Sequence, residues 1–166
     1  MAAYDTDADN PKEVNEPQLC DLLSFSAGNR TFAVPVHEVE ATAEKKRPAV
    51  LPNSPPAVLG IVCVRGRMLT MLDPVCITSG ERLEWPPELP GLIALRGDEQ
   101  LGLAAEAIGE TITIAAADIR PAGSDENAAN GVLSGVARYG GEEITVLRVE
   151  ALFGAAVRKE RRRRRL

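Results

Sequence analysis

The chain contains two blocks that follow the same pattern, and each has the pattern of a β-hairpin. Residues 58–72 run from an apolar stretch through Arg65-Gly66 to a second apolar stretch, and residues 132–147 repeat that order around a glycine-containing break. An apolar run, a glycine-containing break and a second apolar run are typical of two antiparallel strands joined by a turn. The duplication predicts a fold assembled from repeated small β units.

A second pair of segments follows the same logic. Residues 22–36 break at Gly28-Asn29-Arg30, and residues 92–104 break at residues 96–100. The order hairpin, spacer, hairpin therefore occurs twice, which predicts two similar half-domains. A repeat this short, with few catalytic side chains, favours a surface for partners.

Length and composition indicate how the core is made. A chain of 166 residues suits one compact domain, or two small subdomains that share a core. Aromatic residues make up only 4% of the chain, so burial must come from Val, Leu, Ile and Ala, and the β-branched residues among them favour strands. Short strands separated by Gly- or Pro-rich breaks indicate a mainly β fold. Because closed barrels hide strand edges, we expect two small barrels side by side.

The segments between the hairpins carry weaker signals. Proline excludes a helix or a central strand from the connector after the first hairpin, because it lacks an N–H and fixes φ. We expect short helical turns at residues 37–41, 106–108 and 115–119, an extended connector at 45–56, a link between the halves at 78–90, and a polar loop at 121–130.

An amphipathic helix is predicted to close the fold. Apolar residues recur with the spacing of one helix face at Val149, Leu152, Phe153, Ala156 and Val157. Glu150 near its start and Arg158-Lys159 at its end complement the helix dipole.

The two termini carry opposite charge, although the net charge is only −5. Residues 1–17 are small, polar and acidic, and we expect them to be disordered ahead of a folded domain at 18–157. Residues 158–166 form a basic tail with the run Arg161 to Arg165. Such a run can bind nucleic acid or an anionic membrane, so a polyanion-binding module is the alternative function. The tail lacks interleaved aromatic residues that would stack on bases, which favours a solvated tail.

Redox and membrane signals are few. Cys20, Cys63 and Cys76 are odd in number and include no Cys-x-x-Cys pair, which argues against a disulfide framework and a zinc site. No apolar run approaches the roughly 18 residues that cross a bilayer, and the N-terminus does not resemble a signal peptide. We expect a soluble cytoplasmic protein with reduced thiols.

Candidate catalytic residues are isolated. His37 is the only histidine and has no nucleophile motif or second histidine to work with, so we expect a surface or half-buried side chain. Cys63 lies in an apolar run, where a thiol usually behaves as a small inert hydrophobe. The glycines form no nucleotide-binding motif. An enzyme that uses Cys63 or His37 is a rival hypothesis, but we predict no catalytic residue, no cofactor and no metal.

Arg65-Gly66 is the position that stands out. Glycine suits a turn residue with positive φ, and the neighbouring arginine is then presented near the hairpin apex with its donors free. From spacing alone, an ordinary solvated turn arginine explains the residue better.

An ordered set of motifs carries a family resemblance. Its members are a strand, Gly-centred turn and strand at 25–34, a valine at Val39, Pro52-x-x-Pro55 before Gly60, the run Gly60 to Gly66 leading to Asp73, Leu101-Gly102-Leu103 with Ala107-Ile108, Asp118-Ile119-Arg120-Pro121, Gly135-Val136-Ala137, and Ile144 to Leu147. In this order the motifs resemble the CheW-like coupling domains of bacterial chemotaxis signalling. The resemblance covers about residues 19–157.

The resemblance implies a fold and a role. It implies two intertwined SH3-like five-stranded β-barrels with short helical turns and a C-terminal helix. It implies a non-catalytic adaptor that joins the cytoplasmic tip of a chemoreceptor to the regulatory domain of a CheA-type histidine kinase, and that contacts other CheW-like domains. Chemotaxis or a related surface motility would be the output.

The resemblance also implies where partners bind. Val39, Gly60 and Arg65 match family positions associated with receptor or kinase coupling, and Gly66 completes the set as the second turn residue. Cys63 replaces the usual asparagine and Ala41 stands where an acidic residue is common, so the chain is a divergent member.

Overall fold

Four β-hairpins form the framework of the computed structural model, which describes residues 17–121 and 131–156. Each hairpin that the sequence predicts is confirmed. They are β1 (Leu19–Ala27) with β2 (Arg30–Pro35), β4 (Val58–Val64) with β5 (Arg67–Leu72), β6 (Leu89–Leu95) with β7 (Leu101–Ala105), and β10 (Leu133–Tyr139) with β11 (Glu142–Leu147).

Three further strands occupy segments for which no strand was predicted. They are β3 (Val39–Lys46), β8 (Ala107–Ala115) and the two-residue β9 (Arg120–Pro121).

The helical turn expected at 37–41 is shorter, because the 3-10 turn η1 covers Val36–Glu38 and β3 begins directly after it. The helical turn expected at 106–108 is wrong. There β8 pairs with β1, and its Thr-Ile-Thr-Ile alternation buries Ile112 and Ile114 while Thr111 and Thr113 face solvent. The turn expected at 115–119 is confirmed as η2 (Ala116–Asp118).

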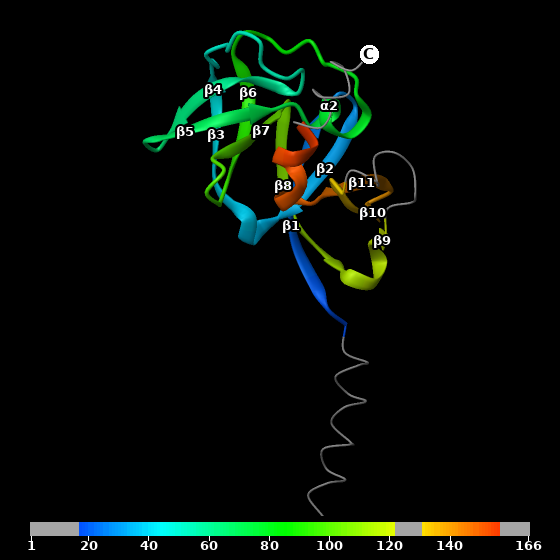
Figure 1. The fold of residues 1–166 in the computed structure, drawn as a ribbon. Helices are drawn as coiled ribbons and strands as arrows, with labels where there is room; N and C mark the ends of the chain where they lie inside the picture. The colour runs from blue at the N-terminus through cyan, green and yellow to red at the C-terminus, as the bar shows by residue number, and fades with distance from the viewer. Residues whose placement is uncertain (1–16, 122–130, 157–166) are drawn as a thin grey trace, which may run out of the picture.

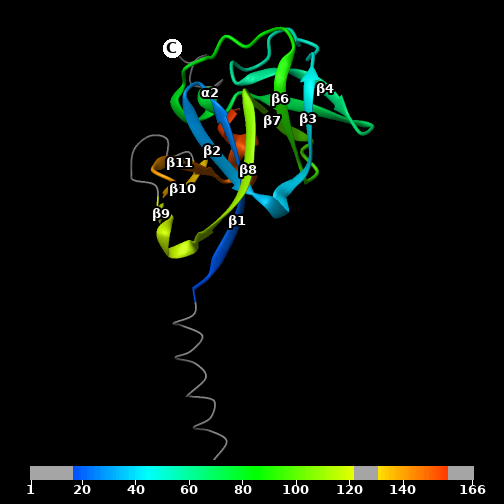
Figure 2. The same ribbon diagram turned by 180° about the vertical axis from the view of Figure 1, so that it is seen from behind.

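The strands form two sheets, and each sheet draws strands from both halves of the chain (Figures 1 and 2). Sheet A has the order β8-β1-β2-β11-β10-β9, and sheet B has the order β3-β6-β7-β5-β4. In sheet A the hairpin β1-β2 lies between β8 and β11, and in sheet B the hairpin β6-β7 lies between β3 and β5. The β2–β11 and β7–β5 pairs are parallel. The mainly β fold of two intertwined units is therefore confirmed, but the two half-domains do not close separately.

In each sheet, a glycine leaves room for the backbone of a neighbouring segment to approach closely. In sheet B, Ala49 of the proline-rich connector exchanges backbone hydrogen bonds of 2.8 and 3.0 Å with Ile61 of β4. A Cβ on Gly60 would lie 2.6 Å from the Ala49 carbonyl oxygen. In sheet A, a Cβ on Gly135 would lie 2.5 Å from the Arg120 carbonyl oxygen of β9. Both glycines lie at register shifts of their strands. The repeated block therefore places the same close backbone approach in both sheets.

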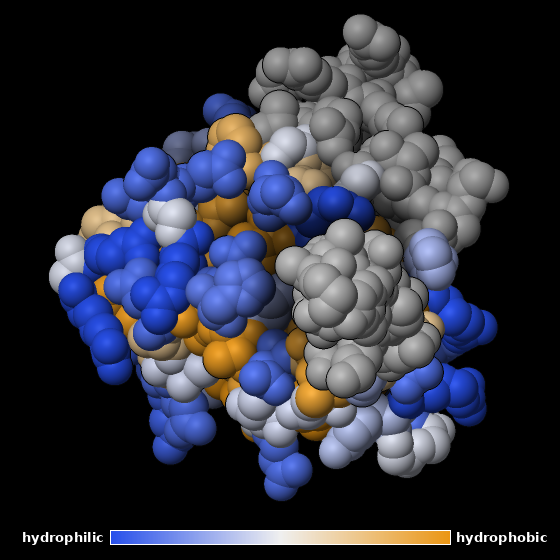
Figure 3. Space-filling model, turned by 90° about the horizontal axis from the view of Figure 1, so that it is seen from below, coloured by the Kyte–Doolittle hydropathy of each residue, from blue (hydrophilic) through white to orange (hydrophobic). Residues whose placement is uncertain are grey.

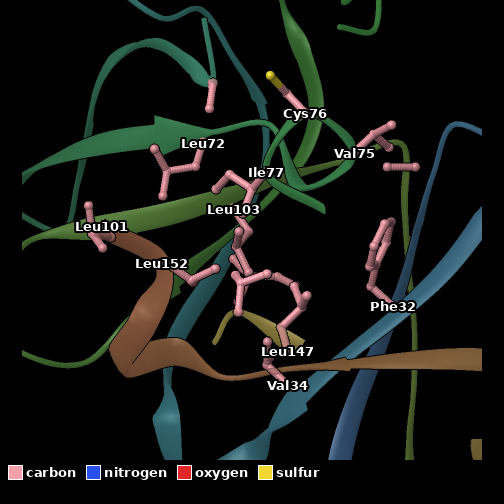
Figure 4. Close-up of a cluster of buried hydrophobic side chains, with 14 of the residues drawn as sticks. Phe32, Val34, Leu72, Val75, Cys76, Ile77, Leu101, Leu103, Leu147 and Leu152 are labelled. Carbon is pink, nitrogen blue, oxygen red and sulfur yellow. The ribbon is translucent and has the colours of Figure 1, made fainter. Parts of the chain in front are cut away.

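Three apolar clusters make up the core. One cluster lies in each sheet, with Val62, Leu69 and Met71 in sheet B and Ile112, Ala137 and Ile144 in sheet A. The largest cluster combines side chains from both sheets. Figure 4 shows the side chains of this shared core converging from several elements: Phe32, Val34, Leu72, Val75, Cys76, Ile77, Leu101, Leu103, Leu147 and Leu152.

The end of the described chain covers this shared core. A 3-10 turn, η3 (Val149–Ala151), leads into helical residues 152–156, where Leu152, Ala155 and Ala156 are buried. Phe153 was expected on the buried face, but its side chain is 49% exposed. The first turn has the tighter 3-10 winding, so the apolar face is rotated relative to a continuous α-helix.

A short helix, α2 (Pro74–Ser79), follows β5 and was not predicted. The buried carboxylate of Asp73 accepts hydrogen bonds from the backbone N–H groups of Val75 at 2.9 Å and Cys76 at 3.2 Å. Pro74 occupies the first turn, and Gly80 ends the helix in the left-handed conformation with φ of 85°. These are the ordinary start and stop signals of a helix. The predicted link at 78–90 therefore has helix α2 at its start and β6 at its end.

Several sequence predictions lie outside the described residues. They concern the acidic segment at 1–17 apart from its last residue, most of the loop at 121–130, Val157 with Arg158-Lys159, and the basic tail at 158–166. In the described part of the chain, none of the helices is long and apolar enough to span a bilayer.

The two glycines at these close approaches yield a stability prediction. Gly60→Ala and Gly135→Ala are each expected to lower the free energy of unfolding by about 2 kcal/mol or more, because the new Cβ overlaps a backbone oxygen. Gly141→Ala is the matched control, since it has a positive φ of 82° and open space around it, and should cost about 1 kcal/mol. Urea unfolding followed by circular dichroism measures all three. Equal losses in the three variants would contradict the close-approach role.

Candidate functional site

Arg65 and Gly66 form the two-residue turn between β4 and β5. Both residues have positive φ, 52° and 80°, as in the turn type that matches the twist of a hairpin. Positive φ costs a residue with a side chain about 1 kcal/mol. The equivalent turn between β10 and β11 uses Gly140 and Gly141, with φ of 60° and 82°. The hairpin geometry therefore does not explain why an arginine stands at this apex.

The Arg65 side chain is exposed. Among the described residues, its guanidinium has no ion pair or side-chain hydrogen bond. Gly66 is also exposed, with open space where a Cβ would stand. The prediction of an arginine displayed at a hairpin apex is confirmed in its geometry.

Arg67, one residue after the turn, fixes the hairpin to the rest of sheet B. Its guanidinium forms an ion pair with Glu40 of β3, and it donates a hydrogen bond of 3.1 Å to the carbonyl oxygen of Gly97. The Arg67 and Glu40 side chains are 26% and 30% exposed. Since β3 and β5 are separated by β6 and β7 in the strand order, this pair spans the curled end of the sheet. Sequence reasoning missed it because partners that are 27 positions apart leave no local pattern.

Val39 lies next to Glu40, at the start of β3. It pairs with Leu95 of β6 at a register shift, and its half-buried side chain packs against the shared core. The Glu40–Arg67 ion pair therefore brings Val39 and the Arg65 hairpin to the same end of sheet B.

Gly60 lies apart from that surface. It is buried in β4 beneath Pro48 and Ala49 of its own connector, with φ of 142°. Gly60 therefore permits the close approach of residues 48–49 of the same chain.

A groove adjoins the Arg65 hairpin and lies beside η1, the β6–β7 loop and η3. Its volume is about 400 Å³. Its residues are Glu38, Leu95, Arg96, Gly97, Asp98, Glu99, Gln100, Leu101, Val149 and Glu150. Leucine and valine side chains supply an apolar part, and four acidic residues against one arginine make the rim acidic. The Arg67 hydrogen bond to Gly97 connects this groove to the hairpin. Seen from below in Figure 3, the left part of the molecule shows hydrophilic residues around apolar surface.

The reactive side chains are dispersed. His37 is exposed in η1, as expected for a surface residue. Cys63 lies in an apolar run and was expected to behave as a small hydrophobe, but its side chain is exposed on β4. The alternation of β4 buries Val62 and Val64 and turns Cys63 to solvent. Within residues 17–121 and 131–156, no group of three His, Cys, Asp or Glu side chains could hold a metal ion.

Comparison with known proteins identifies the family of the chain. The family model of the CheW-like domain matches residues 21–157. The chemotaxis protein CheW of Helicobacter pylori is 22% identical over 143 residues, which cover 86% of this chain and 86% of that protein. The crystal structure of the scaffolding protein TtCheW from Thermoanaerobacter tengcongensis matches with a TM-score of 0.70 at 18% identity, covering 84% of this chain and 90% of that chain. The family match spans nearly all of the described sheets, and the chain therefore belongs to the CheW-like domain family.

Proposed function

We propose that this protein is a non-catalytic adaptor that couples chemoreceptors to a CheA-type histidine kinase in a chemotaxis or related surface-motility array in the cytoplasm. Family membership and a relative named as a chemotaxis protein support the pathway. The observation that carries the proposal is an exposed Arg65, without an ion pair to any described residue, at an apex where the equivalent hairpin has glycine. A strained residue that the fold does not require is a reason to look for an external partner.

In this proposal the receptor tip lies in the groove beside the Arg65 hairpin. An apolar side chain of the receptor helix packs on Leu95, Leu101 and Val149, and Arg65 supplies a charge-assisted hydrogen bond at the edge. Val39 contributes through the part of its side chain that stays accessible. Gly60 acts indirectly, because it holds the connector against β4.

The kinase regulatory domain docks separately, at the outer ends of the two sheets. In this proposal, other CheW-like domains also dock on this chain at the ends of its sheets. Simultaneous occupation of two surfaces raises the local concentration of kinase at the receptor, so modest individual affinities suffice.

The proposal assigns no catalytic residue and no cofactor. The alternative of a polyanion-binding module depends on Arg161 to Arg165, which lie outside the described residues, and the comparisons give it no support.

The first prediction concerns Arg65. Arg65→Glu should weaken co-sedimentation with receptor-containing membranes and kinase at least about tenfold, equivalent to about 1.4 kcal/mol, because a repulsive charge replaces the contact. Both residues bear a side chain at positive φ, so the melting temperature should stay near wild type. Arg138→Glu, on the equivalent hairpin of sheet A, is the control and should bind normally. Unaltered binding by Arg65→Glu would reject the role.

The second prediction separates the partner contact from the fold. Arg65→Gly should have a stability within about 0.5 kcal/mol of wild type, because relief of the positive-φ cost offsets the added freedom of the unfolded chain. It should nevertheless lose binding as Arg65→Glu does. Normal binding by this variant would mean that the arginine is dispensable.

The third prediction concerns the position of the hairpin. Arg67→Glu should weaken binding and lower stability by about 1 kcal/mol, since it places like charges at Glu40. The double variant Glu40→Arg with Arg67→Glu restores the ion pair in reverse and should recover most of both losses. Binding assays and urea unfolding of the single and double variants form the cycle. No recovery in the double variant would exclude a positioning role for the pair.

A further inference from the structure

The equivalence of the two sheets can be followed residue by residue into β1 and β6. Gly60 of sheet B and Gly135 of sheet A occupy equivalent positions. The parallel pair Met71–Gly102 of sheet B is likewise equivalent to the parallel pair Val146–Ala33 of sheet A. Gly102 pairs with Ala94, and Ala33 pairs with Ser24. Residue for residue, Leu22 in β1 then corresponds to Leu92 in β6, and Leu19 corresponds to Leu89.

The end of sheet A carries an open apolar pocket at these positions. Its volume is about 450 Å³, and Leu19, Cys20, Val36, Ile119, Ser134 and Val146 are among the residues that line it. Leu19 is 63% exposed and Val36 is 37% exposed. Asp21 and His37 are its charged or titratable members, so no single charge dominates.

At the equivalent end of sheet B the same positions are covered. Leu89, which corresponds to Leu19, is only 1% exposed. The cluster that contains Leu89, Leu92 and Met71 packs against Trp85 and Leu59. The Nε1 of Trp85 is buried without a hydrogen-bond partner among the described residues. The indole is therefore held by packing rather than by a polar contact.

The sequence does not repeat the tryptophan at the position that is equivalent in sheet A. Trp85 precedes the first residue of β6 by four positions, and Asn15 precedes the first residue of β1 by four positions. An asparagine offers neither the volume nor the apolar surface of an indole. Ser134, which lines the pocket, also stands where the equivalent position in sheet B has the larger Leu59.

We propose that the pocket at the end of sheet A receives an aromatic side chain from an extended, proline-containing segment of a partner protein. The internal Trp85 supplies the pattern of such a ligand, because its side chain packs on the cluster at the equivalent end of sheet B, and the exposed Pro86 and Pro87 follow it in the sequence. The proposal does not depend on the receptor contact at Arg65, since the pocket lies on the other sheet.

The test uses the full chain with Cys63→Ser. Two thiols then remain, and because Cys76 is buried, modification of Cys20 reports on the pocket. The probe is a synthetic peptide with the sequence of residues 82–89, and its control has alanine in place of tryptophan. The tryptophan peptide should slow modification of Cys20 by a soluble disulfide reagent at least about threefold at saturation, because it excludes solvent from the pocket. It should also shift the amide resonances of Leu19, Val36 and Ser134.

Two variants make the result specific. Val36→Glu places a charge in the pocket and should abolish both effects. Val50→Glu changes an apolar side chain that is 80% exposed in the connector beside sheet B, and it should leave them intact. Loss of protection with the alanine peptide supports the proposal, and equal protection by both peptides, or none by either, overturns it.

Other occupants give distinct outcomes. If residues 1–16 fill the pocket, their deletion will speed Cys20 modification and strengthen peptide binding. If a second copy fills it, sedimentation will show a dimer that Val36→Glu dissociates. Either result overturns the assignment to a partner protein, and unchanged Cys20 reactivity of a monomer supports it. Because Arg65→Glu leaves the pocket untouched, failure here is distinguishable from failure of the proposed function.

Discussion

The parallel pairing of β2 with β11 and of β5 with β7 is the constraint on which the rest of the structure depends. Each pair joins a strand from the first half of the chain to one from the second half, so neither half can complete a sheet alone. The side chains between the sheets, such as Phe32, Leu103 and Leu147, lose contact with water only when both halves are in place. Intertwining thus makes the repeated hairpins one cooperative unit and holds the two outer surfaces in a fixed relation.

Function follows from the positions at which the two equivalent halves differ. The hairpin apex is Arg65-Gly66 in one half and Gly140-Gly141 in the other, although both turns have the same backbone geometry. The open end of one sheet is covered by Trp85, whereas the other sheet has a pocket there. Since the fold tolerates either solution at both places, the side chains that differ are free to serve partners.

The sequence predicted the elements whose signal is local. Glycine-centred turns between apolar runs, such as Gly28-Asn29 and Arg65-Gly66, specify hairpins with residues a few positions apart. Helix α2 was not predicted, although it carries a local signal, Asp73-Pro74 with Gly80. By contrast, β3 has few large apolar residues and forms because β6 pairs with it, and the Glu40–Arg67 ion pair exists only once sheet B curls. The exposed arginine at the hairpin apex was predictable from the sequence. The burial of Gly60 beneath Ala49 was not, because it depends on where the connector passes over β4.

Equilibrium unfolding in urea, followed by backbone amide resonances from both sheets of the full chain, tests the shared-core account most directly. Amides of sheet A, such as that of Ala33, and amides of sheet B, such as that of Leu103, should lose their native signals at one urea midpoint. Two separate midpoints, with one sheet intact while the other is unfolded, would contradict the account, because each sheet could then stand without strands and core side chains from the other half.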